Sequence, residues 1–164
     1  MSEWLVAFHA EHRESIEMLL RLFVAMVSGM AIGLNRDLHD KPMGMRTLGL
    51  VSLSSALVVL AGSAYGHVHF AEDAVSRVVQ GVLTGIGFLG AGVILRREDR
   101  DDVQGLTTAA TVWMAAALGV TAGVGAWFIT IVGNGLALAL LVFGKPLERS
   151  LNSLFGGRRE NSND

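Results

Sequence analysis

Residues that could do chemistry gather in two short charged stretches of an otherwise apolar chain. The first, residues 33–47, reads Gly-Leu-Asn-Arg-Asp-Leu-His-Asp-Lys-Pro-Met-Gly-Met-Arg-Thr. Arg36, Asp37 and Arg46 have the charges to form ion pairs at helix ends near a membrane surface. Pro42 favours a turn between them. The chemistry expected of this stretch is therefore charge pairing.

The second charged stretch lies at residues 96–102 and is rich in carboxylates. Oxygen ligands are those that Mg²⁺ prefers, so loose Mg²⁺ binding is one interpretation of the acidic run, and a solvated loop is the one we favour. The candidate ligands are Asp37, Glu98, Asp99, Asp101 and Asp102. The chain has no cysteine, which excludes disulfides, thiol catalysis and Cys-ligated metals. We expect no obligatory cofactor.

No arrangement typical of an enzyme accompanies these charges. The Gly-x-Gly-x-x-Gly pattern at residues 85–90 lies inside an apolar segment, where it indicates helix packing and not a dinucleotide loop after a strand. The net charge of −2 gives no reason to expect nucleic acid as a partner. The sequence therefore predicts a protein that is not an enzyme.

Uncharged stretches of membrane-spanning length separate the charged segments. A bilayer core of about 30 Å needs roughly 20 helical residues. Residues 47–66 and 78–95 contain no charge, and residues 103–144 are uncharged for twice that length, with a glycine-rich turn expected at 119–125. The pattern predicts an all-α, polytopic membrane helix bundle of about five transmembrane helices. The expected spans are about 16–34, 47–66, 78–95, 105–122 and 126–144.

The first span must begin before its uncharged part. Residues 22–34 are too few to cross a bilayer, so we expect the helix to start near Ile16. Arg21 then lies near one end, with its side chain extended to the lipid headgroups. A short membrane-embedded helix is the alternative. Residues 1–15 carry more Glu than Arg, which predicts an external or interfacial segment and not a cleaved signal peptide.

The Lys and Arg residues alternate in density from one connection to the next. Three segments, namely the first connection, the third connection and the end of the chain, hold 10 of the 13 basic residues. Basic loops remain in the cytoplasm, so the N-terminus is expected outside and the C-terminus inside. This organisation predicts a transmembrane domain at 16–146 and a cytoplasmic tail at 147–164, in a bacterial inner membrane.

Small residues recur every four positions in several expected spans. Residues four apart share a helix face, and small ones let two backbones approach closely in lipid. Two polar residues, Asn134 and Gln80, are candidates for hydrogen bonds between helices, and Gln80 is alternatively part of a polar path. The expected packing residues are Gly29, Gly33, Gly81, Thr111, Ala115, Gly119 and Asn134. The faces are expected to pack mostly within one chain, with one of them forming a homodimer.

The same stretches resemble the membrane domain of the MgtC/SapB family. Its pattern is Gly-x-Glu-Arg-Glu, then Lys-Pro-Ala-Gly-x-Arg-Thr, then Gly-Ile-Gly-Phe-Leu-Gly-Ala-Gly, then Gly-Leu-Thr-Thr-Ala-Ala. The resemblance covers residues 29–125. Carried over residue by residue, the pattern falls on Arg36, Asp37, Lys41, Pro42, Gly44, Arg46, Thr47, Gln80, Gly81, Gly85, Gly87, Phe88, Gly90, Gly92, Gly105, Leu106, Thr107 and Thr108, with Trp113 just beyond.

Three positions depart from the family pattern. Asn35 stands where the family usually has Glu, Asp37 replaces a second Glu, and Met43 replaces Ala. Any role that needs the first carboxylate is therefore in doubt here. The chain resembles the short YhiD/SapB type, and we expect it to lack the soluble C-terminal domain of longer members.

The resemblance implies a regulatory membrane protein linked to growth in low Mg²⁺ and to virulence. Its implied partners are other membrane proteins, such as the F-type ATP synthase or a Mg²⁺ transporter. The alternative, from a different class, is a small cation (Mg²⁺) transporter or channel that acts as a dimer. Polar residues in the spans, including Gln80 and Asn134, would line its path.

Overall fold

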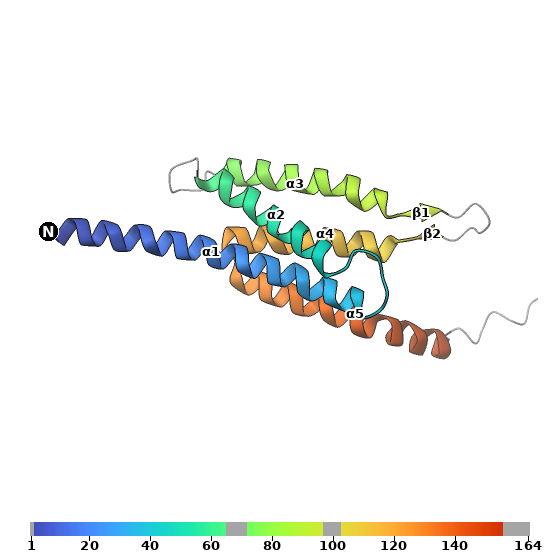
Figure 1. Cartoon of the computed structure of the whole chain (residues 1–164). Helices are drawn as coiled ribbons and strands as arrows, with labels where there is room; N and C mark the ends of the chain where they lie inside the picture. The colour runs from blue at the N-terminus through green and yellow to red at the C-terminus, as the bar shows by residue number, and fades with distance from the viewer. Residues whose placement is uncertain (1, 65–71, 97–102, 156–164) are drawn as a thin grey trace, which may run out of the picture.

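The computed structural model describes residues 2–64, 72–96 and 103–155, and in that part of the chain it is almost entirely helical (Figure 1). Each of the helices found there contains a segment long and apolar enough to cross a membrane, as the uncharged stretches predict. The helices are α1 (Ser2–Asp37), α2 (Met45–Ala64), α3 (Glu72–Gly92), α4 (Leu106–Val124) and α5 (Trp127–Phe155).

Two helices are longer than the expected spans. α1 is continuous from Ser2, where a separate interfacial segment was expected, and its N-terminal part projects beyond the other helices (Figure 1). α5 continues past Pro146 to Phe155, into the segment expected to be a tail. Hydropathy cannot detect such extensions, because a helix that leaves the membrane keeps its backbone hydrogen bonds while its side chains become polar.

A short β-ladder joins α3 to α4. β1 (Leu95–Arg96) pairs antiparallel with β2 (Val103–Gln104), so that Leu95 lies opposite Gln104. α3 consequently ends at Gly92, three residues before the expected end of the third span. Two-residue strands have no measurable hydrophobic period, which is why the sequence pattern did not predict them.

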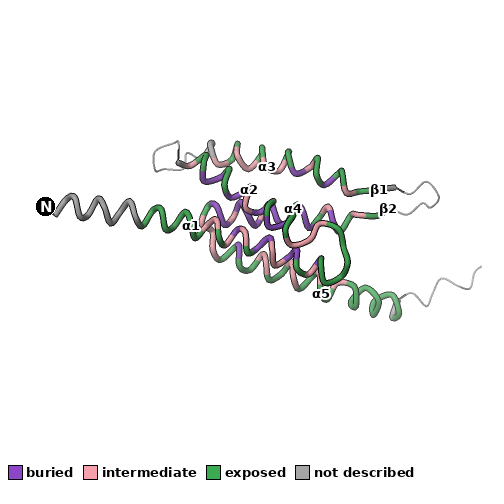
Figure 2. Tube along the Cα trace, viewed as in Figure 1, coloured by how far each residue is buried: buried purple, intermediate pink, exposed green. Residues whose placement is uncertain are grey.

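The core of the bundle is formed by α1, α2 and α4. Figure 2 shows the buried residues concentrated in these helices. α1 runs antiparallel to α2, because Gly29 faces Ser52 while Gly33 faces Met45. α4 runs parallel to α2, because Gly119 faces Ser52 while Gly123 faces Ala56. The buried apolar residues are Ala25, Ile32, Leu48, Ala56, Val59, Leu60, Ile86, Val112, Ala115, Ala116, Leu118, Val120 and Ala122.

Glycine makes these close approaches possible. A Cβ built at Gly29 would lie 2.7 Å from the Ser52 Cβ, and one at Gly33 would lie 2.6 Å from the Met45 nitrogen. A Cβ at Gly119 would lie 2.8 Å from the Ser52 carbonyl carbon. Real side chains do not approach this closely, so any side chain at these positions would force the backbones apart.

α3 and α5 lie at the outside of the bundle. Half of the apolar window of α4 is buried, against 11% for α3 and 6% for α5. Their large side chains face outward, as Phe88 does on α3 and Phe128 on α5. In a membrane these two helices present the broadest lipid-facing surfaces of the described chain.

The expected turn at residues 119–125 is much shorter than predicted. α4 remains helical to Val124, and Gly125 ends it with φ = 87°, the left-handed conformation typical of a helix C-terminus. The Gly125 N–H donates to the Ala122 carbonyl at 3.0 Å. The glycines before it are therefore packing residues, and Gly125 makes the turn.

Candidate functional site

Arg36 lies at the end of α1 with its side chain directed into the bundle. It is 5% exposed, although it is a charged residue. Its Nη2 donates to the Thr108 Oγ1 in the first turn of α4 and, at 3.4 Å, to the Pro42 carbonyl. Its Nε has no hydrogen-bond partner. Arg36 thus ties three segments together: α1, the turn that follows it, and the start of α4.

Asp37, the next residue, caps α2. Its Oδ2 accepts a hydrogen bond of 2.9 Å from the Met45 N–H, the first backbone donor of that helix. A Cβ at Gly44 would overlap the Asp37 carboxylate, so a side chain there would displace the cap. A carboxylate at a helix N-terminus accepts a hydrogen bond from a backbone N–H and also interacts favourably with the helix dipole.

The turn between α1 and α2 contains two residues in the left-handed region. Asp40 has φ = 50° and Met43 has φ = 65°. The Lys41 N–H donates to the Arg36 carbonyl at 3.0 Å, which closes the turn onto the end of α1. Met43, where the family pattern has Ala, packs against the main apolar core.

The ion pairs expected in this stretch are not formed. Among the described residues the ion pair observed is Arg21–Glu17, in α1. Neighbouring helical residues point about 100° apart, so Arg36 faces inward while Asp37 faces the start of α2. Arg46, like Lys41 and Thr47, is exposed. The sequence predicted which charges gather here but not which way each one points.

The other end of α4 is held by Arg21. Its Nη1 donates to the Gly123 carbonyl at 3.0 Å, and its Nη2 donates to Glu17. The side chain that was expected to extend to the headgroups is thus bound within the chain, because a carbonyl at the end of a neighbouring helix is within its reach. A cation at a helix C-terminus also interacts favourably with the helix dipole.

The two arginines of α1 therefore bracket α4. The same 15 residues separate Arg21 from Arg36 and Thr108 from Gly123, as expected for two antiparallel helices in register. This spacing corresponds to about 22 Å of helix. Arg21 was not among the candidate functional residues. Its 15-residue separation from Arg36, equal to that of Gly123 from Thr108, is the sequence signal that could have identified it.

Gly105 precedes α4 and has a conformation that favours glycine. Its φ is 95°, and a Cβ there would lie 2.9 Å from the Val93 carbonyl carbon. Its carbonyl accepts a hydrogen bond of 2.8 Å from the Ala109 N–H, which starts the helix. Leu106 and Thr107, which follow it, are exposed. The Gly-Leu-Thr-Thr block thus places Thr108 beside Arg36.

The glycine-rich end of α3 is mostly open. A Cβ at Gly85, or at the other open glycines of α3, would have no atom within 4 Å; these others are Gly81, Gly87 and Gly92. Gly90 differs, because it is buried and a Cβ there would lie 3.8 Å from the Trp113 Cδ1 of α4. Phe88 is 83% exposed. The face of Gly81, one of the expected packing residues, is therefore open within one chain.

Most polar groups at membrane depth bond to backbone carbonyls. The Ser52 Oγ donates to the Ala25 carbonyl of α1 at 2.6 Å, and the Thr111 Oγ1 donates to the Thr108 carbonyl at 2.8 Å. Gln80 is exposed on α3. Asn134 is half-buried on α5, and its Oδ1 has no hydrogen-bond partner. Gln80 and Asn134 therefore lie on the two outer helices and do not line a shared path in one chain.

The acidic run that could bind Mg²⁺ lies outside the described residues. This applies to Glu98, Asp99, Asp101 and Asp102. In the part of the chain that is described, no three His, Asp or Glu residues gather in a way that could hold a metal ion. The carboxylate of Asp37 is occupied by the start of α2.

Comparison with known proteins gives this arrangement a family. The model of the MgtC family matches residues 22–150, which include every contact described above except those of Arg21 with Glu17 and Gly123. The chain belongs to the MgtC family. Arg36, Asp37 and the Gly-Leu-Thr-Thr block are thus elements of an MgtC domain, and the resemblance inferred from the sequence is confirmed.

Named bacterial proteins are among the relatives of this MgtC-family chain. Protein SrpB of Synechococcus elongatus is 47% identical over 79% of this chain and 75% of its own length. A protein named "Putative magnesium transporter YhiD", from Escherichia coli K12, is 38% identical over 83% of this chain and 65% of its own length. Protein MgtC of Salmonella typhimurium is 32% identical over 83% of this chain.

These MgtC-family relatives differ in how much of their own length is matched. The chain spans 56% of the Salmonella protein and 48% of Protein SapB of Bacillus subtilis, to which it is 39% identical. No solved structure matches the chain. The family match and the long apolar helices together show that the chain is a multi-pass membrane protein that consists mainly of the MgtC domain.

Proposed function

We propose that this chain is a non-enzymatic regulatory protein of the bacterial inner membrane, which acts by contacting other membrane complexes. A membrane ATPase such as the F-type ATP synthase, or a Mg²⁺ transporter, is the partner class, and growth in low Mg²⁺ is the setting. Both ideas come from the family resemblance. A homodimer is the proposed oligomeric state.

The observation that carries this proposal is the use of the family-pattern residues inside the bundle. Arg36, Asp37 and Gly105 hold helix ends together, and the hydroxyls of Ser52 and Thr111 donate to backbone carbonyls. Groups engaged in this way stabilise a scaffold and leave few free ligands for a passing ion. The outer helices α3 and α5 meanwhile remain uncovered in one chain. This arrangement supports a protein that offers helix faces to partners.

Site-specific photo-crosslinking in cells tests this proposal. A photoreactive residue at Ile131 or Leu140, which are 69% and 74% exposed on α5, should give discrete adducts with one membrane complex. The same probe at Ala115, which is fully buried in α4, is the matched control and should give none. Proton pumping by inverted vesicles should change when the protein is present. Diffuse labelling from every exposed position, with unchanged pumping, would contradict the proposal.

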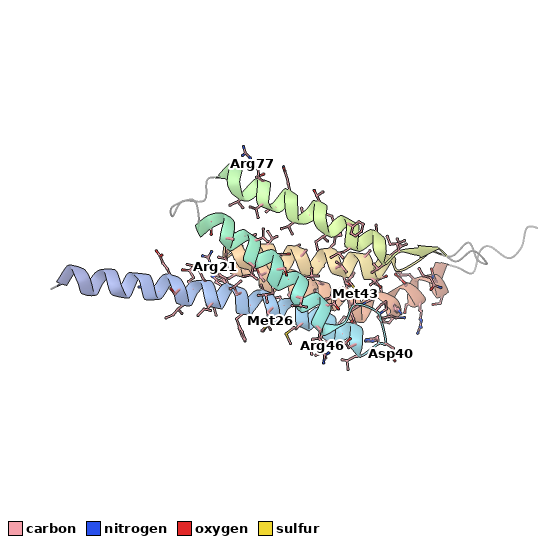
Figure 3. The ribbon with its side chains drawn as sticks, turned by 45° about the horizontal axis from the view of Figure 1, so that its top comes forward. Arg21, Met26, Asp40, Met43, Arg46 and Arg77 are labelled. Atoms are coloured by element: carbon pink, nitrogen blue, oxygen red, sulfur yellow. The ribbon has the colours of Figure 1, made fainter. Side chains whose placement is uncertain are left out.

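The proposed topology has the N-terminus outside and the C-terminus in the cytoplasm. It rests on the concentration of Lys and Arg in alternate connections. Because the chain has no native cysteine, single Cys residues at Arg46 and Arg77 can be labelled without background. Figure 3 shows these positions at opposite ends of the bundle. An impermeant thiol reagent applied to spheroplasts should label the Arg77 position and spare the Arg46 position.

Cation transport is the second candidate, and the name of the YhiD relative is the observation that favours it. The purified chain in liposomes would then pass Mg²⁺ above the level of empty liposomes, and Asp37→Ala would reduce the flux. Asn134→Leu is the matching test of the outer helix. Absence of flux for any common divalent cation would exclude this candidate and leave the regulatory proposal intact.

A further inference from the structure

An apolar groove of about 430 Å³ lies between α2 and α3. The two helices touch at one end, where a Cβ at Gly62 would lie 2.9 Å from the Val78 Cγ2. α3 then diverges from α2 towards α4, which it meets at Gly90 (Figure 1). The diverging helices leave a groove that opens to the side of the bundle.

Missing side chains on α3 keep this groove open. Gly81 and Gly85 line it, and a Cβ at either would meet no atom within 4 Å. The opposite wall is the face of α2 that carries Leu50 and Val58, and Leu89 of α3 is a further apolar lining residue. These glycines therefore make no contact in one chain but define the shape of the groove.

One mouth of the groove is cationic. Arg46 and Thr47 line it there, in the first turn of α2. Arg46 is exposed and makes no ion pair with a described residue, while the nearby Asp37 carboxylate accepts the Met45 N–H. Because that carboxylate already caps the N-terminus of α2, the free positive charge at this mouth is the Arg46 guanidinium. The groove thus combines an apolar length with an anion-binding end.

The size of the groove selects its occupant. From Arg46 to Val58 it follows α2 for about 18 Å, more than half of the roughly 30 Å hydrocarbon core. The volume falls within the range of small-ligand sites, about 300–1,000 Å³. A single hydrocarbon chain matches a groove of this length and volume, and the cationic mouth favours a chain that carries an anionic headgroup.

We propose that this groove binds one acyl chain of an anionic phospholipid, whose phosphate group is bound by Arg46. The apolar walls hold the chain at membrane depth, and the guanidinium holds the headgroup at the surface. Neither the regulatory function nor the transport alternative is needed for this site.

Native mass spectrometry of the purified full chain tests the proposal, with phosphatidylglycerol or phosphatidylcholine added to the detergent. The wild type should retain one lipid and prefer phosphatidylglycerol about fivefold, as expected for one basic residue. Gly85→Leu fills the groove and should lose binding of both lipids. Gly135→Leu is its control, because Gly135 is equally open but lies on α5.

Arg46→Gln separates the headgroup from the acyl chain. It should retain a bound lipid but lose the preference for phosphatidylglycerol, whereas Lys145→Gln, which removes an exposed charge on α5, should keep it. Equal lipid binding by the wild type and Gly85→Leu would overturn the proposal. So would a change from dimer to monomer in Gly85→Leu with lipid binding unchanged, because the groove would then be a contact between two copies.

Discussion

Replacing Gly119 with alanine should destabilise the bundle through a single methyl group. Gly119 is buried where α4 crosses α2, and an added Cβ would overlap the Ser52 carbonyl oxygen and lie 2.8 Å from its carbon. Carbon atoms attract best at about 3.5–4.0 Å. The obstacle is backbone, so no side-chain rotation can relieve it, and α2 and α4 must separate by about 1 Å.

The magnitude follows from that separation. A gap of about 0.5–1 Å forfeits a quarter to a half of the dispersion energy across a contact. Overpacked cores typically lose about 1–3 kcal/mol, and a clash with rigid backbone belongs at the upper end of that range. We therefore expect Gly119→Ala to lower the free energy of unfolding by about 2–3 kcal/mol.

Unfolding in mixed micelles with increasing sodium dodecyl sulfate, followed by circular dichroism, measures this change. Gly81→Ala and Gly135→Ala are the controls, because a Cβ at either position meets no atom within 4 Å. Alanine is favoured over glycine in helices by about 0.5–1 kcal/mol, so these variants should be as stable as the wild type or more so. Equal stability of Gly119→Ala and Gly81→Ala would refute the close crossing of α2 and α4.

Three further predictions concern the helix ends. Asp37→Ala removes the cap of α2 and should cost about 0.5–2 kcal/mol in the same titration, with Glu148→Ala, which removes an exposed carboxylate on α5, as the control. Gly105→Ala should cost more than Asp37→Ala, because it combines φ = 95° with an overlap of the Val93 carbonyl, and thermal melting of the purified protein checks this order. Arg36→Gln should lower the melting temperature, and in a double-mutant cycle its effect should shrink when Thr108 is already Val. Additive effects of those two substitutions would contradict the hydrogen bond between them.

Much of the fold could be predicted because membrane spans depend on a simple property of the sequence. Stretches without charge, such as residues 47–66, set the number of spans, and the four-residue spacing of small residues identified the faces at Gly29 and Gly119. The β-ladder at Leu95 could not be predicted, because its strands are too short for any pattern. The polar extension of α5 was missed for a related reason, since hydropathy reports where a membrane ends and not where a helix ends.

The candidate site was predicted in its composition but not in its geometry. The family pattern selected Arg36, Asp37 and Thr108, and the structure places Arg36 against Thr108. Spacing alone could not show that the adjacent residues Arg36 and Asp37, of opposite charge, bond to different helices, α4 and α2. The spacing of small residues also could not show which faces pack within one chain, because a Cβ at Gly81 would meet no atom within 4 Å whereas one at Gly29 would meet α2.

The central position of α4 has a consequence for how the protein is made. Ribosomes deliver α1, α2 and α3 to the membrane first, yet the helix around which they pack is the fourth to emerge. Until α4 is inserted, the face of the α1–α2 hairpin around Ser52 must be covered by lipid. Insertion of α4 then displaces that lipid. The buried core of the bundle therefore forms late in biogenesis, after the outer helix α3 has entered the membrane.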